Sequence, residues 1–126
     1  MKNKQFIFYV IFGLSSVILD YLVFKILITF FKFTFIIANI ISVNVGIINS
    51  FLLNYKLNFK TTNNLFLRFI SFYTIGLLGL LLSSLLLFYL IEILQIEVII
   101  SKCITIIIVS FFQFIFNLTI TFKKIK

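Results

Sequence analysis

The chain has 126 residues, of which 63% are hydrophobic and 11% are charged, and its mean hydropathy is +1.27. An average soluble domain is about 45–50% apolar and about 25% charged, so water would not keep this chain folded. The formal net charge of +8 does not indicate nucleic-acid binding, because the basic residues are spread between apolar segments rather than gathered on one polar surface. The composition therefore predicts a membrane protein with no nucleic-acid partner.

Four apolar segments are each long enough to cross a bilayer as a helix. A hydrocarbon core of about 30 Å needs roughly 20 residues at a helical rise of about 1.5 Å per residue. The segments are residues 6–31, 36–55, 66–93 and 98–121. They predict an all-α membrane protein, with a single transmembrane domain over residues 1–126. The basic start of the first segment also resembles a signal peptide, but no small-residue cleavage site follows, so this segment is expected to remain as a helix.

The stretch NSFLLNYKLNFK at residues 49–60 has a counterpart, QFIFNLTITFK, at residues 113–123. Four positions recur at a constant offset of 63 residues: Phe51, Asn54, Phe59 and Lys60 return as Phe114, Asn117, Phe122 and Lys123. Because 126 is 2 × 63, the chain is interpreted as two repeats of two helices each, residues 1–63 and 64–126.

The basic residues predict how these repeats are oriented. Eight of the 11 Lys and Arg lie before the first segment, between the second and third, or after the fourth, whereas Lys25, Lys32 and Lys102 lie elsewhere. The positive-inside rule then puts both termini in the cytoplasm. Each half starts and ends inside, so the two halves are predicted to be parallel rather than inverted repeats.

Each segment also carries small or polar residues spaced by three or four positions, which places them on one face of a helix. These residues are Gly13, Ser16 and Asp20; Ala38, Ser42, Gly46 and Ser50; Gly76, Gly79 and Ser83; and Ser101, Thr105, Val109 and Gln113. Small residues let helix backbones approach closely in lipid. We expect these faces to form the core of the bundle or the seam of a dimer.

Asp20 is the first candidate functional residue. It lies 14 residues beyond Phe6, about 21 Å along a helix and about two-thirds of the way across the bilayer. An ionised carboxylate there costs several kcal/mol unless it is paired, hydrated or protonated. The second helix reaches this depth between Asn39 and Asn44, so we hypothesise that Asp20 faces Asn39, Ser42 and Asn44 across a small substrate-binding cavity. A structural hydrogen bond to the second helix is the alternative.

The other candidates lie at the inner boundary of the membrane. Asn54 either caps a helix end or holds a lipid head group. A basic ring of Lys56, Lys60, Arg68 and Lys123 is attributed mainly to topology, with binding of anionic lipid phosphate, at about 1 kcal/mol per residue, as a second role. The chain has no His, a single Cys and three acidic residues, so we expect no metal, no cofactor and no enzymatic activity.

These residues together resemble the GtrA-like family of small four-helix bacterial membrane proteins. The resemblance rests on Gly13 with Asp20 seven residues later, the pair Ala38-Asn39, and Phe51-Leu-Leu-Asn54 before Phe59. The family usually has two basic residues and an aromatic after the Asn, whereas this chain has Tyr-Lys-Leu at that place. The resemblance implies a protein of the bacterial cytoplasmic membrane that translocates polyprenyl-phosphate-linked sugars, with a membrane glycosyltransferase as partner.

Three functions follow as hypotheses. The first is a flippase for lipid-linked sugars, which needs a polar groove through the membrane lipids and, with only four helices per chain, is expected to be a homo-oligomer. The second is an accessory subunit that holds a glycosyltransferase at the membrane and moves nothing. The third is a small proton-coupled exporter of cations, with Asp20 as the exchanging carboxylate.

Overall fold

The computed structural model describes residues 3–59, 65–116 and 119. Within these residues it contains four α-helices: α1 (Asn3–Thr29), α2 (Phe35–Leu53), α3 (Leu65–Phe88) and α4 (Val98–Phe116). Two short π-helical segments continue α2 and α3, namely η1 (Asn54–Phe59) and η2 (Tyr89–Ile93). The predicted all-α class is confirmed, and each helix falls on one of the four apolar segments.

All four helices are long and apolar enough to span a membrane. The candidate spans are Ile7–Thr29, Phe35–Leu57, Phe69–Ile93 and Val98–Phe116. Their outer faces carry large apolar side chains that are more than half exposed, among them Leu14, Ile18, Leu81 and Phe111. Such a surface suits hydrocarbon rather than water, and helices satisfy their own backbone hydrogen bonds there.

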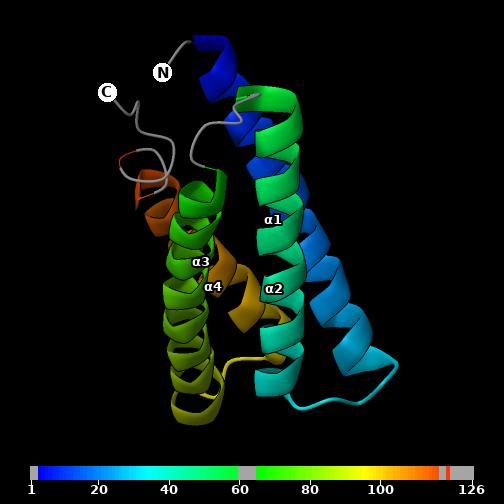
Figure 1. Ribbon diagram of the computed structural model, residues 1–126. Helices are drawn as coiled ribbons and strands as arrows, with labels where there is room; N and C mark the ends of the chain where they lie inside the picture. The colour runs from blue at the N-terminus through cyan, green and yellow to red at the C-terminus, as the bar shows by residue number, and fades with distance from the viewer. Residues whose placement is uncertain (1–2, 60–64, 117–118, 120–126) are drawn as a thin grey trace.

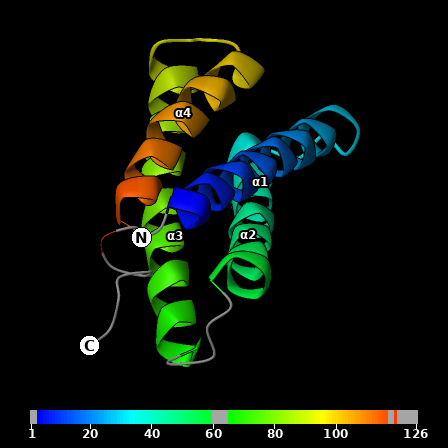
Figure 2. The ribbon, with the colours of Figure 1, turned by 90° about the horizontal axis from the view of Figure 1, so that it is seen from above.

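Helices that follow one another in the chain are also neighbours in space. The pairs α1 and α2, α2 and α3, and α3 and α4 pack side by side, whereas α1 and α4 touch less. Figures 1 and 2 show α1 and α4 inclined to α2 and α3. The start of α1 and the end of α4 lie at the end of the bundle where α2 passes toward α3 (Figure 1).

The small-residue faces meet in the middle of the bundle, which is the first of the two arrangements expected for them, the bundle core rather than a dimer seam. Ala38, Ser42, Ser101 and Thr105 are completely buried, and Ser83 nearly so. The closest approach is between α1 and α2 at Gly46, where an added Cβ would lie 3.2 Å from the backbone oxygen of Ser16. Two apolar clusters fill the space around these contacts. One comprises Val43, Ile47, Phe51 and Phe72, and the other Phe24, Ala38 and Leu87.

The turn from α1 to α2 and the turn from η2 to α4 have the same construction, 63 residues apart. Lys32 and Gln95 have φ of 56° and 57°, in the left-handed region. The amide of Phe33 donates to the carbonyl of Leu27 at 3.0 Å, and that of Ile96 to the carbonyl of Leu90 at 2.8 Å. Each bond reaches back six positions across the left-handed residue, one position further than the bond of a Schellman motif, and closes the C-terminal end of its helix. The match accords with two repeats, although the repeats themselves and the cytoplasmic placement of the termini stay predictions.

Gln95→Gly should stabilise the fold. A left-handed residue with a Cβ is strained by about 1–2 kcal/mol, and Gly removes that strain, so we expect a gain of about 1 kcal/mol in the free energy of unfolding. Titration of the purified protein in mild detergent with a denaturing detergent, followed by circular dichroism, measures it. Gln95→Ala is the matched control, because Ala keeps the Cβ; equal stability of the Gly and Ala variants would contradict the prediction.

Candidate functional site

An ion pair joins the first and last helices inside the bundle. Nζ of Lys102, on α4, lies 2.8 Å from Oδ1 of Asp20, on α1. The Lys102 side chain is completely buried, and that of Asp20 is 15% exposed. Because a charge at this depth is costly without a partner, each residue compensates the other. Asp20 is therefore accommodated within the membrane span by its ion pair with Lys102.

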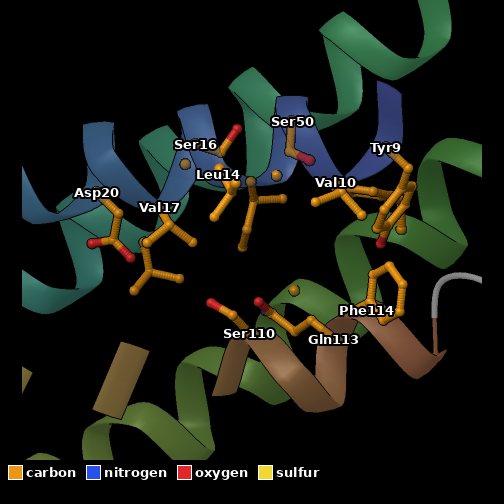
Figure 3. A pocket seen from close by; sticks show the side chains of 16 residues that line it. Tyr9, Val10, Leu14, Ser16, Val17, Asp20, Ser50, Ser110, Gln113 and Phe114 are labelled. Atoms are coloured by element: carbon orange, nitrogen blue, oxygen red, sulfur yellow. The ribbon is translucent and has the colours of Figure 1, made fainter. Parts of the chain in front are cut away.

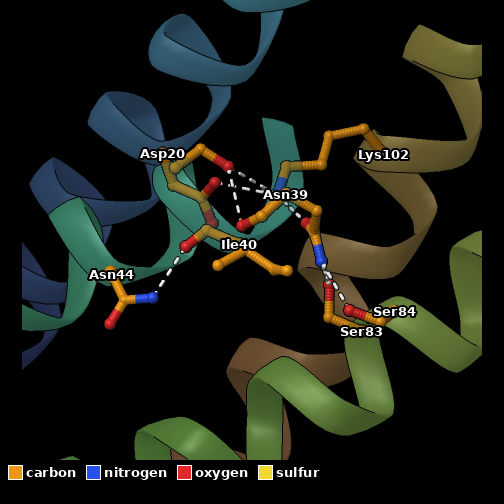
Figure 4. A network of polar contacts seen from close by, with 8 residues as sticks. Asp20, Asn39, Ile40, Asn44, Ser83, Ser84 and Lys102 are labelled. Carbon is orange, nitrogen blue, oxygen red and sulfur yellow. Dashed lines mark hydrogen bonds and ion pairs between the residues drawn. The ribbon is translucent and has the colours of Figure 1, made fainter. Parts of the chain in front are cut away.

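Acceptors on α2 complete the surroundings of the ammonium group (Figure 4). Lys102 Nζ donates to Oδ1 of Asn39 at 2.8 Å and to Oγ of Ser42 at 3.5 Å. With Asp20, these give three acceptors for the three N–H donors of a lysine. The ring of Phe24 adds a fourth contact, since its centroid lies 4.9 Å from Nζ. The buried ammonium is thus fully solvated by protein groups.

Asn39 extends the network to α3. Its Nδ2 donates to Oγ of Ser83 at 3.0 Å and to Oγ of Ser84 at 3.3 Å, while its Oδ1 faces Lys102. Every helix therefore contributes one residue to a polar cluster that we call the central cluster: Asp20, Asn39, Ser83 and Lys102 (Figure 4).

The sequence pattern places Lys102 among the three lysines that do not follow the positive-inside rule, and it predicts no partner for this residue. The structure corrects this, because Lys102 is the counter-ion of Asp20. A signal for it was present: Lys102 is Asn39 plus 63, and Ser83 is Asp20 plus 63. The Asp20–Lys102 pair and the Ser83–Asn39 pair are thus related by the same offset as the two halves of the chain.

The other predicted site residues are placed as follows. Asn39 and Ser42 do lie at the Asp20 level, linked to it through Lys102. Asn44 does not join them: its Nδ2 donates to the carbonyl of Ile40, and its Oδ1 accepts from the hydroxyl of Tyr73 on α3. The buried Asn54 is the C-cap of α2, and its Nδ2 donates to the carbonyl of Ser50 at 2.9 Å.

Lys56 is the one member of the predicted basic ring whose side chain belongs to the described structure. It is exposed on η1, beside an apolar pocket between α2 and α3. The side chains of Lys60, Arg68 and Lys123 lie outside the described residues. Phosphate binding by this ring stays a prediction.

A pocket of about 210 Å³ lies beside the central cluster and is lined by all four helices. Asp20 is the one charged residue in its lining, and Ser16, Ser50, Ser110 and Gln113 supply hydroxyl and amide groups. Figure 3 shows Ser110 and Gln113 on α4 pointing across it toward α1. Along α1 the lining runs from Tyr9 to Asp20, 11 residues or about 16 Å, roughly half of the hydrocarbon thickness.

Two contacts between α1 and α4 bound this pocket. One is the ion pair of Asp20 with Lys102, and the other is an edge-to-face contact of Tyr9 with Phe114, whose ring centroids are 5.3 Å apart. Between them an added Cβ at Gly13 would meet nothing within 4 Å. The pocket is therefore open space between α1 and α4, and Ser110 and Gln113 line it on the α4 side.

These features define a multi-pass membrane protein whose helical bundle holds a largely apolar pocket that also carries a few polar groups. The chain matches the GtrA/DPMS transmembrane domain over residues 8–122, and it belongs to that family, as the resemblance of its motifs predicts. Membership connects it with membrane-associated functions that involve glycosyl lipids. Neither a curated protein nor a solved structure matches the chain.

Breaking the ion pair should destabilise the bundle more than removing it altogether. Lys102→Met or Asp20→Asn leaves one charge without its partner, for which we expect a loss of about 3–5 kcal/mol. The double variant, Asp20→Asn with Lys102→Met, leaves neither charge and should recover most of that loss. Unfolding titrations in detergent measure all three proteins. Lys25→Met, an exposed lysine of α1, serves as control, and strictly additive losses in the double variant would refute the coupling.

Proposed function

We propose that this protein moves polyprenyl-phosphate-linked sugars across the bacterial cytoplasmic membrane, from the inner to the outer leaflet, to supply glycosylation of cell-envelope polysaccharide. Family membership supports a role with glycosyl lipids. The pocket is the observation that carries the proposal, because a polar sugar needs polar groups within the hydrocarbon, and this pocket follows α1 for about 16 Å with polar groups set among apolar side chains.

The hydroxyl, amide and carboxylate groups of the pocket are suited to this task. Inside a bilayer no water replaces the hydrogen bonds that a sugar loses on leaving the surface, and each unmade bond costs several kcal/mol. Ser110 and Gln113 offer replacements from α4, and the Ser50 hydroxyl offers a further one from α2. On the outer leaflet the sugar would be used by a membrane glycosyltransferase, which is the partner that the proposal requires.

The exporter hypothesis is less consistent with the site. A carboxylate that exchanges protons for a cationic substrate must be free to receive that cation, whereas Asp20 is held 2.8 Å from the Lys102 ammonium. A cationic substrate would have to displace a lysine that two further acceptors retain. The ion pair therefore argues against a cationic substrate.

Filling the pocket should stop transport without unfolding the protein. Because a Cβ at Gly13 meets nothing within 4 Å, Gly13→Leu would place its side chain in the open space. We expect transbilayer movement of a fluorescent polyprenyl-phosphate sugar in proteoliposomes to fall about tenfold or more, since the polar surface that replaces water is covered. The rate is measured by chemical quenching of the lipid left in the outer leaflet.

Ser15→Leu is the matched control. It adds similar bulk two residues away, on an exposed position of the same helix, so transport should continue. Equal rates for Gly13→Leu and wild type would remove the pocket from the path. No movement by folded wild-type protein would contradict the flippase and favour the accessory-subunit hypothesis, which predicts co-purification with a glycosyltransferase instead.

A further inference from the structure

We infer that the pocket receives the sugar of the lipid and excludes its phosphate, with Gln113 and Ser110 as the residues that recognise the sugar hydroxyls. This inference rests on the proposed function and specifies the part of the substrate that enters the protein. It comes from the charges, the unused hydrogen-bonding groups and the size of the pocket.

The charges of the lining oppose a phosphate. Asp20 is the one charged residue among the 16 that line the pocket, and it is an anion. Its counter-ion, Lys102, is completely buried behind it and is not part of the lining. A phosphate in the pocket would therefore meet no cation free to bind it, because Lys102 already binds Asp20 and two acceptors on α2, and its charge would stay uncompensated within the membrane span.

The unused polar groups favour a sugar. Within the described residues, the side chains of Ser110 and Gln113 make no hydrogen bond to protein, although both point into the pocket (Figure 3). An amide both donates and accepts, and a serine hydroxyl does the same, which is what sugar hydroxyls require. The Asp20 carboxylate adds a strong acceptor for a hydroxyl proton. Tyr9, Phe72 and Phe114 provide rings for the apolar face of a sugar.

Gly79 on α3 leaves space for the side-chain amide of Gln113. A Cβ at position 79, on α3, would overlap the Gln113 side chain and lie 2.8 Å from its Cδ, so Gly79 allows the amide to rest against the α3 backbone. Gly79 is a positioning residue in this sense. Gly79→Ala should displace the flexible amide rather than the helices, because the end of a long side chain yields more easily than packed backbone.

The volume sets the size of the ligand. About 210 Å³ corresponds to roughly seven liquid waters at about 30 Å³ each, the scale of one sugar ring. It is below the roughly 300–1,000 Å³ of sites for drug-sized ligands. The pocket would therefore accept a monosaccharide, while the phosphate and the polyprenyl chain stay outside it.

Lipid binding in nanodiscs tests the inference without requiring transport. The probes are short-chain polyprenyl phosphate and its glucosyl, galactosyl, mannosyl and N-acetylglucosaminyl derivatives. Wild-type protein should bind at least one glycosylated lipid more tightly than bare polyprenyl phosphate. Gln113→Leu should reduce affinity for that glycosylated lipid about tenfold, as for one lost hydrogen bond with an acceptor left unpaired, and should leave affinity for the bare lipid unchanged.

Further variants separate the possible outcomes. Ser110→Ala and Gly79→Ala should also lower the affinity for the glycosylated lipid alone, whereas Phe112→Leu, on the half-exposed outer face of α4, should change neither affinity. An equal loss for both lipids in Gln113→Leu would mean that the pocket takes the phosphate, and no loss for either would mean that it is not the binding site; each result overturns the inference. So does a wild-type protein that does not prefer any glycosylated lipid.

These measurements can reject the inference and the proposed function independently of each other. Sugar-dependent binding that Gln113→Leu abolishes, combined with no lipid movement in vesicles, would retain the inference and reject the flippase. Movement that Gly13→Leu blocks, combined with equal binding of glycosylated and bare lipid, would do the reverse.

Discussion

A lysine with no exposed surface, inside a helix that crosses the membrane, is the constraint on which the rest of this structure depends. Hydrocarbon provides no acceptors for its ammonium group, so the protein must supply all of them. Lys102 finds one on α1 and two on α2, each with a defined distance. Since α1 and α4 otherwise touch less than neighbouring helices do, the pair with Asp20 fixes how the bundle closes.

The central cluster consists of two pairs of residues, one neutral and one charged. Ser83 and Asn39 form a neutral hydrogen bond between α3 and α2, at positions 63 residues from Asp20 and Lys102, which form the charged one. Interhelical hydrogen bonds in membranes average about 0.6 kcal/mol, whereas loss of one partner of a buried ion pair costs about 3–5 kcal/mol. The charged pair of Asp20 and Lys102 therefore contributes more to the stability of the bundle than the neutral pair does. Asp20 also lines the pocket.

Much of this could be predicted from the sequence, because hydrophobic length and small-residue spacing are local properties. The four helices, the buried faces and the common depth of Asp20, Asn39 and Ser42 all follow from them. The partner of Asp20 was missed because a lysine near the outer end of a helix was interpreted through topology alone. Asn44 was misplaced because it lies five residues, about 140° of helical turn, from Asn39, so its side chain contacts Tyr73 on α3 and does not reach Lys102 and Asp20.

The pocket could not be predicted in this way, since periodicity assigns a residue to a face but not to a gap. Gln113 and Val109 share one face of α4; Val109 is buried against neighbouring helices, whereas Gln113 borders open space. The difference depends on where α1 and α4 touch: they meet at Lys102 and at Phe114, and an added Cβ at Gly13 between these contacts would have no neighbour within 4 Å. The hydrogen-bonding groups of Ser110 and Gln113 at that gap have no protein partner among the described residues, and the proposed sugar ligand would supply the partners that hydrocarbon does not.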